Sequence, residues 1–181
     1  DDDARVFLLS VFPEYIDLFD HLKGAHRADV LRYLLLYRYG GVYLDIKTIP
    51  MKPLDALFPD RSTTLYTALG ETEIMHGHQA IWQGVLAAPR GHSVLHALVN
   101  NAQIHFKGNN DFHYFFFIKD FYRTLQKTTG KDLLSVGYTS FAGANSPGVF
   151  LYNESCVKQG RVAGQSCDQL DRYGLCCYIT Y

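Results

Sequence analysis

The sequence has no long hydrophobic run and no excess of charge of one sign. Its densest apolar stretches, residues 6–12 and 114–118, are far shorter than the roughly 20 residues of a membrane-spanning helix. Lys and Arg number 17 and Asp and Glu number 18, which gives a net charge of −1. Proteins that coat nucleic acid or acidic membranes need clustered Lys and Arg. We therefore expect no nucleic-acid partner, and contact with a membrane only through an anchor outside this chain.

Four common catalytic signatures are missing as well. The sequence contains no G-x-G-x-x-G, no G-x-x-x-x-G-K-[ST], no G-x-S-x-G and no H-E-x-x-H. The sequence therefore gives no support for a Rossmann dehydrogenase, a P-loop nucleotidase, an α/β-hydrolase or a zinc protease.

Cysteine is absent from the first 155 residues and then clusters near the C-terminus, at Cys156, Cys167, Cys176 and Cys177. The spacing suits no structural zinc site, so we expect two disulfides that tie down a tail over residues 151–181, with Cys156 and Cys167 closing the easiest loop. Asn153 begins an N-glycosylation sequon beside this tail. Together these features indicate a glycoprotein of the secretory lumen.

What the sequence does contain is typical of one folded domain over residues 1–181. Apolar residues make up 48% of the chain and charged residues 19%. Residues 1–22 are expected to begin with a short strand or turn and to continue as an amphipathic helix around 13–22. Further helices are expected over 25–39, 92–104 and 111–126, and strands over 42–46, 63–69, 81–88 and 135–138. Strands that alternate with helices predict an α/β layered fold.

The helix over 25–39 carries the first candidate site residues. Ala28, Leu31 and Leu35 recur at helical spacing and predict the buried stripe. Asp29 and Arg32 are three residues apart, so they share a face of the helix. They are either a surface ion pair, worth about 0.5 kcal/mol or less, or part of a binding site.

A glycine turn at Gly40 and Gly41 ends this helix, and a short strand then leads to Asp45. In open α/β sheets ligands bind at the carboxyl ends of strands, so Asp45 would stand at the crevice. A carboxylate there can hold a ribose hydroxyl or a divalent cation. The plain alternative is that Asp45 only forms a turn.

Residues 26–53, with the sequence R-A-D-V-L-R-Y-L-L-L-Y-R-Y-G-G-V-Y-L-D-I-K from Arg27, resemble the sugar-binding region of DXD-type glycosyltransferases of family 32. This family includes α-1,6-mannosyltransferases of the fungal Golgi. The resemblance extends more loosely over residues 81–98. It implies a GT-A fold, an α/β sandwich with a mixed sheet flanked by helices. The first strand of that family, with its I-x-Q-x-W-like segment, has no counterpart here, so we expect the chain to be part of a longer protein.

The resemblance also implies a hexosyltransferase that moves a sugar from a UDP- or GDP-sugar, with retention, to a hydroxyl of a glycan, lipid or protein in the Golgi lumen. Asp29 and Arg32 would hold hydroxyls of the donor sugar, and the backbone at Gly40 and Gly41 would pass close to the donor. Asp45 would contact the ribose or sugar and help to hold Mn²⁺ or another divalent cation. Tyr43 would pack in the core.

One position departs from the family pattern. Lys47 occupies the place of the second Asp of D-x-D, and an ammonium group cannot coordinate a cation. We favour the interpretation that Lys47 faces the diphosphate and stabilises the leaving group in place of the metal, which makes it a catalytic residue beside Asp45. The alternative is a weakened or inactive descendant that binds nucleotide-sugars without transferring them.

Overall fold

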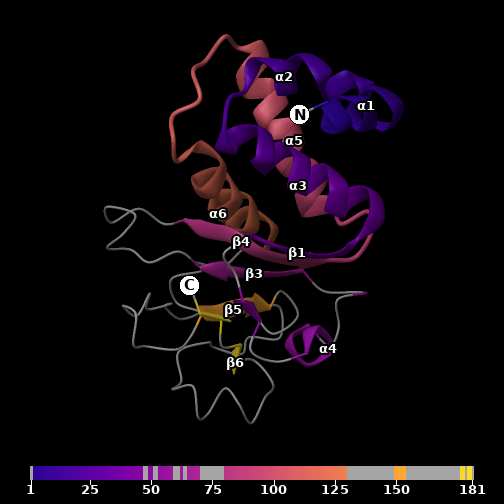
Figure 1. Ribbon diagram of the computed structural model, residues 1–181. Helices are drawn as coiled ribbons and strands as arrows, with labels where there is room; N and C mark the ends of the chain where they lie inside the picture. The colour runs from indigo at the N-terminus through magenta and orange to yellow at the C-terminus, as the bar shows by residue number, and fades with distance from the viewer. Residues whose placement is uncertain are drawn as a thin grey trace.

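In a computed structural model of the chain, a group of helices covers one face of an antiparallel sheet (Figure 1). The structure describes residues 2–46, 49–50, 53–58, 62, 65–69, 80–129, 149–153, 176–177 and 179–180. The helices are α1 (Asp2–Val11), the 3₁₀-helix η1 (Pro13–Tyr15), α2 (Ile16–His21), α3 (Ala25–Tyr39), α4 (Leu54–Leu57), α5 (Ser93–Lys107) and α6 (Phe116–Thr129). The strands are β1 (Gly41–Leu44), β2 (Ile49–Pro50), β3 (Tyr66–Leu69), β4 (Ile81–Ala88), β5 (Val149–Asn153), β6 (Cys176–Cys177) and β7 (Ile179–Thr180).

The main sheet has the strand order β1-β4-β3-β5-β6, and β2 pairs with β7 separately. Every described strand pair is antiparallel, so the mixed sheet that the sequence led us to expect is not found among the described strands. The connection between β3 and β4, residues 70–80, is too short for the crossover of a dozen or more residues that parallel neighbours require.

Strand β4 lies at the centre of the molecule and contributes to two apolar clusters. Its side chains divide between a helix-side cluster, which takes Ile81, Leu86 and Ala88, and a cluster on the opposite face, which takes Trp82, Val85 and Ala87. Thr67 of β3 pairs with Leu86, but the next residue, Ala68, pairs with Trp82, so residues 83–85 bulge out of this ladder. Bulges of this kind re-aim side chains, and this one supplies part of the site described below.

Helix α1 replaces the entry strand or turn that we expected at the start of the chain. Ala4, Phe7, Leu8 and Val11 repeat at helical spacing and pack into the helix-side cluster. Asp2 and Asp3 stand in the first turn, where negative charge favours a helix. The expected helix around 13–22 is present as η1 followed by α2.

The expected extent of helix α3 is confirmed, but the buried face that we inferred for it is wrong. Ala28 is exposed and Leu35 is only partly buried. The fully covered side chains are Val30, Arg32, Tyr33, Leu34 and Leu36. Because α3 packs against α5 on one side and against β1 and β4 on another, a wider part of its surface is buried than one stripe would cover.

The later elements of the chain agree with the expected ones in part. The strand over 81–88 is confirmed, and the helix over 92–104 corresponds to α5. The helix expected from residue 111 begins only at Phe116, and the expected strand over 135–138 lies outside the described residues. Cys156 and Cys167 also lie outside them, while Cys176 and Cys177 form β6, which pairs with β5.

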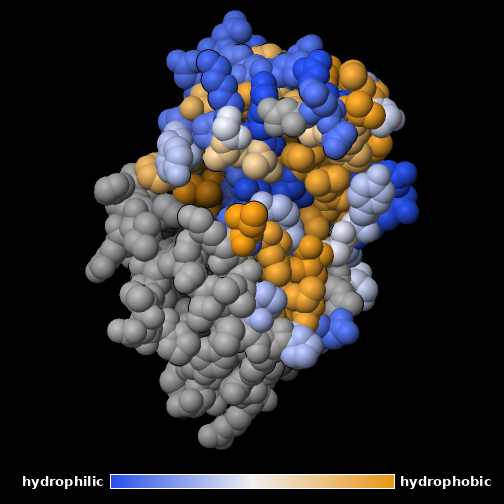
Figure 2. All heavy atoms as spheres, viewed as in Figure 1, coloured by the Kyte–Doolittle hydropathy of each residue, from blue (hydrophilic) through white to orange (hydrophobic). Residues whose placement is uncertain are grey.

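The described surface is mixed in character. On the face drawn in Figure 2, hydrophilic side chains cover the top of the molecule over α2, and apolar side chains gather at the right over α1. No helix among the described residues is long and apolar enough to cross a membrane.

Candidate functional site

The structure brings together three of the residues singled out from the sequence. The Nη2 atom of Arg32 lies 3.3 Å from Oδ1 of Asp29, and its Nη1 atom lies 3.5 Å from Oδ1 of Asp45. Arg32 is 8% exposed, Asp29 13% and Asp45 33%. One guanidinium therefore holds two carboxylates, and the carboxylate of Asp45 is the most accessible of the three groups.

The backbone explains why these groups meet. Asp29 and Arg32 lie one turn apart on α3, which packs against β1 and β4. Asp45 follows directly after β1, and its backbone N–H donates to the carbonyl of Gly84 at 2.9 Å. The pairing of β1 with β4 thus fixes Asp45 beside the bulge, facing the buried side of α3.

Tyr43 packs against the helix-side cluster, as expected, and it also contacts two residues of the site. The guanidinium of Arg32 lies over its ring, 4.6 Å from the centroid. Its hydroxyl donates to Oδ1 of Asp45 at 2.7 Å. Tyr43 precedes Asp45 by two residues, and side chains two apart in a strand point to the same face, so the sequence contained the signal for this contact.

Gln83 is the site residue that sequence reasoning missed. It is 3% exposed and sits in the bulge of β4. Its backbone carbonyl accepts a hydrogen bond from Nη1 of Arg32 at 2.8 Å. With the amide oriented to satisfy its neighbours, Nε2 donates to Oδ1 of Asp29 at 2.8 Å, and Oε1 accepts from the Tyr33 hydroxyl at 2.7 Å and from the N–H of Ile118 at 3.2 Å.

A sequence signal for Gln83 existed, because it is a polar residue inside an otherwise apolar strand, I-W-Q-G-V-L-A-A. A buried amide needs partners for its donors and acceptors. These partners come from α3 and α6, which are far from β4 in sequence, so local reasoning could not identify them.

Burial sets the electrostatics of the site. It raises the pKa of Asp29 to about 6, although the charges of Arg32 and His26 act in the opposite direction, and the nearby charge of Asp45 adds to the rise. Burial and the hydrogen bond to Asp45 raise the pKa of Tyr43 to about 12. At neutral pH, Asp29 is therefore mostly ionised, while Tyr43 keeps its proton and remains a hydrogen-bond donor.

The raised pKa of Asp29 predicts a pH dependence of stability that Asp29→Asn removes. The ordinary value of 3.8 applies to the unfolded chain, so between about pH 4 and pH 6 unfolding releases a proton and stability falls as pH rises. Above pH 6 the ionised Asp29 lowers the free energy of unfolding by a constant amount, about 3 kcal/mol. Urea unfolding of wild type and Asp29→Asn at pH 4, 5, 6 and 7 measures this slope.

Asp17→Asn, at an exposed position of α2, serves as the matched control for that series. If the slope between pH 4 and pH 6 is the same for wild type and Asp29→Asn, Asp29 does not carry a raised pKa in the folded protein.

Two other predicted residues do not join this cluster. Gly40 lies between α3 and β1 and Gly41 begins β1, whereas Asp45 follows the end of this strand. Gly40 has φ +68°, and a Cβ atom there would stand 2.7 Å from the backbone nitrogen of Arg90. This close packing accounts for the glycine at position 40, and a role of either glycine at the donor stays a prediction. Lys47 lies outside the described residues.

Among the described residues, the oxygen atoms around Arg32 do not fit a divalent cation. Oδ1 of Asp45 already accepts the Tyr43 hydroxyl and lies 3.5 Å from a guanidinium nitrogen of Arg32. Within the part of the chain that the structure describes, no group of three or more His, Cys, Asp or Glu side chains could hold a metal ion. A cation such as Mn²⁺ needs several oxygen ligands and is repelled by a fixed positive charge.

Comparison with known proteins confirms the resemblance inferred from residues 26–53. Residues 3–64 match the family model described as "Glycosyltransferase sugar-binding region containing DXD motif". No solved structure is significantly similar to the chain, so the GT-A architecture stays an expectation beyond the helices and antiparallel sheet found here.

Three curated relatives illustrate the match. Inositol phosphoceramide mannosyltransferase 3 of Schizosaccharomyces pombe is 38% identical over 58 residues, 32% of this chain and 16% of the relative. Mannosyl phosphorylinositol ceramide synthase SUR1 of Saccharomyces cerevisiae is 38% identical over 58 residues, 32% of this chain and 15% of the relative. The uncharacterized glycosyltransferase L373 of Acanthamoeba polyphaga mimivirus is 44% identical over 55 residues, 29% of this chain and 22% of the relative.

The matched segment thus spans about a sixth to a fifth of the length of these relatives. The family-model match over residues 3–64 covers nearly all of α1 and the whole of α2, α3 and β1, and it contains all three charged residues of the cluster. Residues 3–64, in which Asp29 and Asp45 gather around the guanidinium of Arg32, therefore match the glycosyltransferase sugar-binding region that contains the DXD motif.

Proposed function

We propose that this chain is part of an enzyme that transfers a hexose from a UDP- or GDP-sugar to a hydroxyl of a glycan, lipid or protein, with retention at the anomeric carbon. One relative is named as an inositol phosphoceramide mannosyltransferase and another as a mannosyl phosphorylinositol ceramide synthase, which favours mannose as the sugar and a phosphoinositol lipid as the acceptor. The clustered cysteines and the sequon support a location in the secretory lumen, with any membrane anchor outside the chain.

The observation that carries the proposal is the convergence of Asp29, Arg32 and Asp45. Two carboxylates held at a fixed spacing present acceptor oxygens for sugar or ribose hydroxyls. Arg32 already donates to Ala28 and Gln83 and faces both carboxylates, so most of its five N–H groups are engaged. Its main task in this proposal is to fix the two carboxylates, and Asp45, the more exposed of them, makes the first contact with the donor.

Catalysis in this proposal rests on positioning and on charge at the departing diphosphate. Asp29 and Asp45 orient the donor sugar, and the Tyr43 hydroxyl keeps Asp45 in place by donating to it. Lys47, two residues after Asp45, supplies the positive charge that stabilises the leaving group. No residue is assigned as the acceptor-side base.

A second candidate function is supported by the identity of residue 47. With Lys at the second position of D-x-D, the chain could be a nucleotide-sugar-binding module that has lost transfer. In both readings residues 1–181 form one domain with the tail over 151–181 packed on it, a proposal that the pairing of β6 with β5 supports.

Two assays distinguish the transferase from the binding module. Thermal shift of the protein against UDP- and GDP-sugars, with and without Mn²⁺, tests for a pocket and its base preference. Hydrolysis of the same nucleotide-sugars then tests turnover: release of nucleoside diphosphate supports the enzyme, and binding without release supports the module. No shift with any nucleotide-sugar would contradict both.

Lys47→Ala is expected to lower the turnover number by about 100-fold, because a fixed charge at the developing diphosphate acts mainly in the transition state. Lys52→Ala, a charge removal in the same segment, is the matched control and should leave turnover within about twofold of wild type. Single-turnover rates with saturating donor measure the effect. A Lys47→Ala protein as fast as wild type would remove Lys47 from the mechanism.

A further inference from the structure

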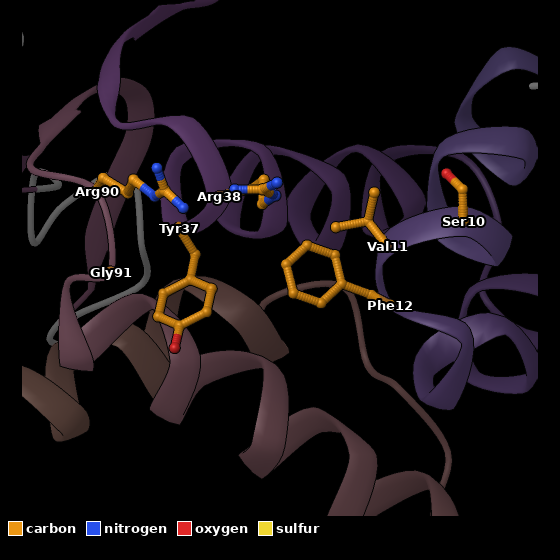
Figure 3. Close-up of a pocket in the computed structure, with 7 residues that line it drawn as sticks. All are labelled: Ser10, Val11, Phe12, Tyr37, Arg38, Arg90 and Gly91. Carbon is orange, nitrogen blue, oxygen red and sulfur yellow. The ribbon is translucent and has the colours of Figure 1, made fainter.

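A separate hollow lies at the other end of α3 and β1, away from the cluster around Arg32. Its volume is about 480 Å³. It is lined by residues 10–12, where α1 ends, by Tyr37 and Arg38 in the last turn of α3, and by Arg90 and Gly91 just before α5 (Figure 3). The proposed reaction uses none of these residues.

The charge in this hollow is positive. Arg38 and Arg90 both line it, and neither has an acidic partner within 4 Å among the described residues. The C-terminal end of α3 carries about half a negative charge and the N-terminal end of α5 about half a positive charge, so the two helix ends nearly cancel. Two full guanidinium charges remain. Guanidinium groups bind phosphate oxygens through paired N–H donors.

The surface beside the hollow is apolar. Val6 and Leu9 on α1 are 66% and 54% exposed, and Tyr39 at the end of α3 is 62% exposed. Val6 and Leu9 lie three residues apart and share a face of α1 with Ser10, which lines the hollow. Apolar side chains gather over α1 in Figure 2 as well.

The aromatic ring of Tyr39 connects this apolar surface to the hollow. The ring of Tyr39 lies 6.1 Å from that of Phe7 on α1, and the guanidinium of Arg38 lies 5.5 Å from the Tyr39 ring centroid. One continuous surface therefore carries two unpaired cations in a recess and large exposed apolar side chains at its edge.

We propose that this hollow binds the phosphate headgroup of an anionic membrane lipid. Arg38 and Arg90 bind the phosphate oxygens, while Val6, Leu9 and Tyr39 enter the interfacial region beside the headgroup. A free soluble phosphate would make no use of the exposed apolar side chains, and this favours the lipid. The net charge of −1 argues against a chain that coats acidic membranes, but it does not bear on a recess that takes one headgroup.

Vesicle co-sedimentation tests the proposal. Wild type is expected to sediment with vesicles of phosphatidylcholine mixed with phosphatidylinositol and to bind vesicles of phosphatidylcholine alone much more weakly. Replacing both Arg38 and Arg90 by Ala should weaken binding to the mixed vesicles by about 10- to 30-fold, since each Arg near an anionic surface contributes a factor of about five. The double variant Arg123→Ala, Lys127→Ala removes the same charge from exposed positions of α6 and should bind as wild type does.

The apolar edge is tested separately, with Val6→Ser and Leu9→Ser together. This variant should lose vesicle binding but keep any thermal shift caused by inorganic phosphate. The proposal would be overturned if the α6 control lost as much vesicle binding as the double variant of Arg38 and Arg90. It would also be overturned if that double variant bound the mixed vesicles as wild type does. A phosphate-induced thermal shift with no vesicle binding would also overturn it, in favour of a soluble phosphate. None of these measurements depends on a nucleotide-sugar, so their failure is distinct from a failure of the proposed function.

Discussion

Replacing Arg32 by Met is expected to lower the free energy of unfolding by about 3–5 kcal/mol at pH 7, because it leaves the largely buried carboxylate of Asp29 and the partly exposed carboxylate of Asp45 without their cation. The Met side chain keeps most of the contact with the Tyr43 ring, so the loss measures the charge and hydrogen bonds more than the packing. The carbonyl of Gln83 loses its donor as well. Urea unfolding followed by circular dichroism gives the difference.

The control for this prediction is Arg38→Met, on the same helix and without an acidic partner among the described residues. Arg38→Met should lower the free energy of unfolding by less than about 1 kcal/mol. In the double variant with Asp29→Asn, one of the stranded carboxylates is gone, so the two losses should not add, and a coupling of about 1–3 kcal/mol is expected. Additive losses would mean that Arg32 and Asp29 do not interact in solution.

The second large effect is expected for Gln83→Leu. This change keeps the approximate size of the side chain but removes the acceptor for the Tyr33 hydroxyl and for the N–H of Ile118, and the donor to Asp29. Each buried group left without a partner costs about 1–3 kcal/mol, so a total of about 3–5 kcal/mol is expected. The same urea unfolding measures it.

Gln83→Leu should also affect binding, since Gln83 holds Asp29 directly. We expect the affinity for nucleotide-sugar to fall by 10-fold or more in the fraction of protein that remains folded. Gln103→Leu is the matched substitution, because among the described residues the Gln103 amide donates one hydrogen bond, at 3.0 Å, to the carbonyl of Glu14. If the two variants lose equal stability and neither changes affinity, Gln83 is not part of the site.

Much of the site was already predictable from a short segment of sequence. Asp29 and Arg32 share a helix face whatever the helix packs against, because the spacing of three residues fixes this. The glycine turn and the short strand place Asp45 one strand length beyond the end of the same helix. The expected bounds of α3 and β4 were right for a similar reason, since α3 is a run without Gly or Pro and β4 is a largely apolar segment that ends before Pro89.

The inferences that failed concern contacts between elements distant in the sequence. The buried stripe assigned to α3 was wrong because α5, β1 and β4 together cover a wider surface. The start of the chain was predicted to be a strand or turn, but it forms helix α1. The apolar residues of α1 recur at helical spacing, and they favour a helix because the rest of the fold supplies a core in which they are buried.

The sequence by itself therefore determined which charged residues could form the site and which family model residues 3–64 match. Only the tertiary structure decided that a bulge in β4 supplies Gln83 and that two arginines, one from α3 and one from the approach to α5, share one hollow. The physical reason is that the hydrogen bonding and burial of these groups depend on partners about 35 or more positions away, which no local spacing encodes.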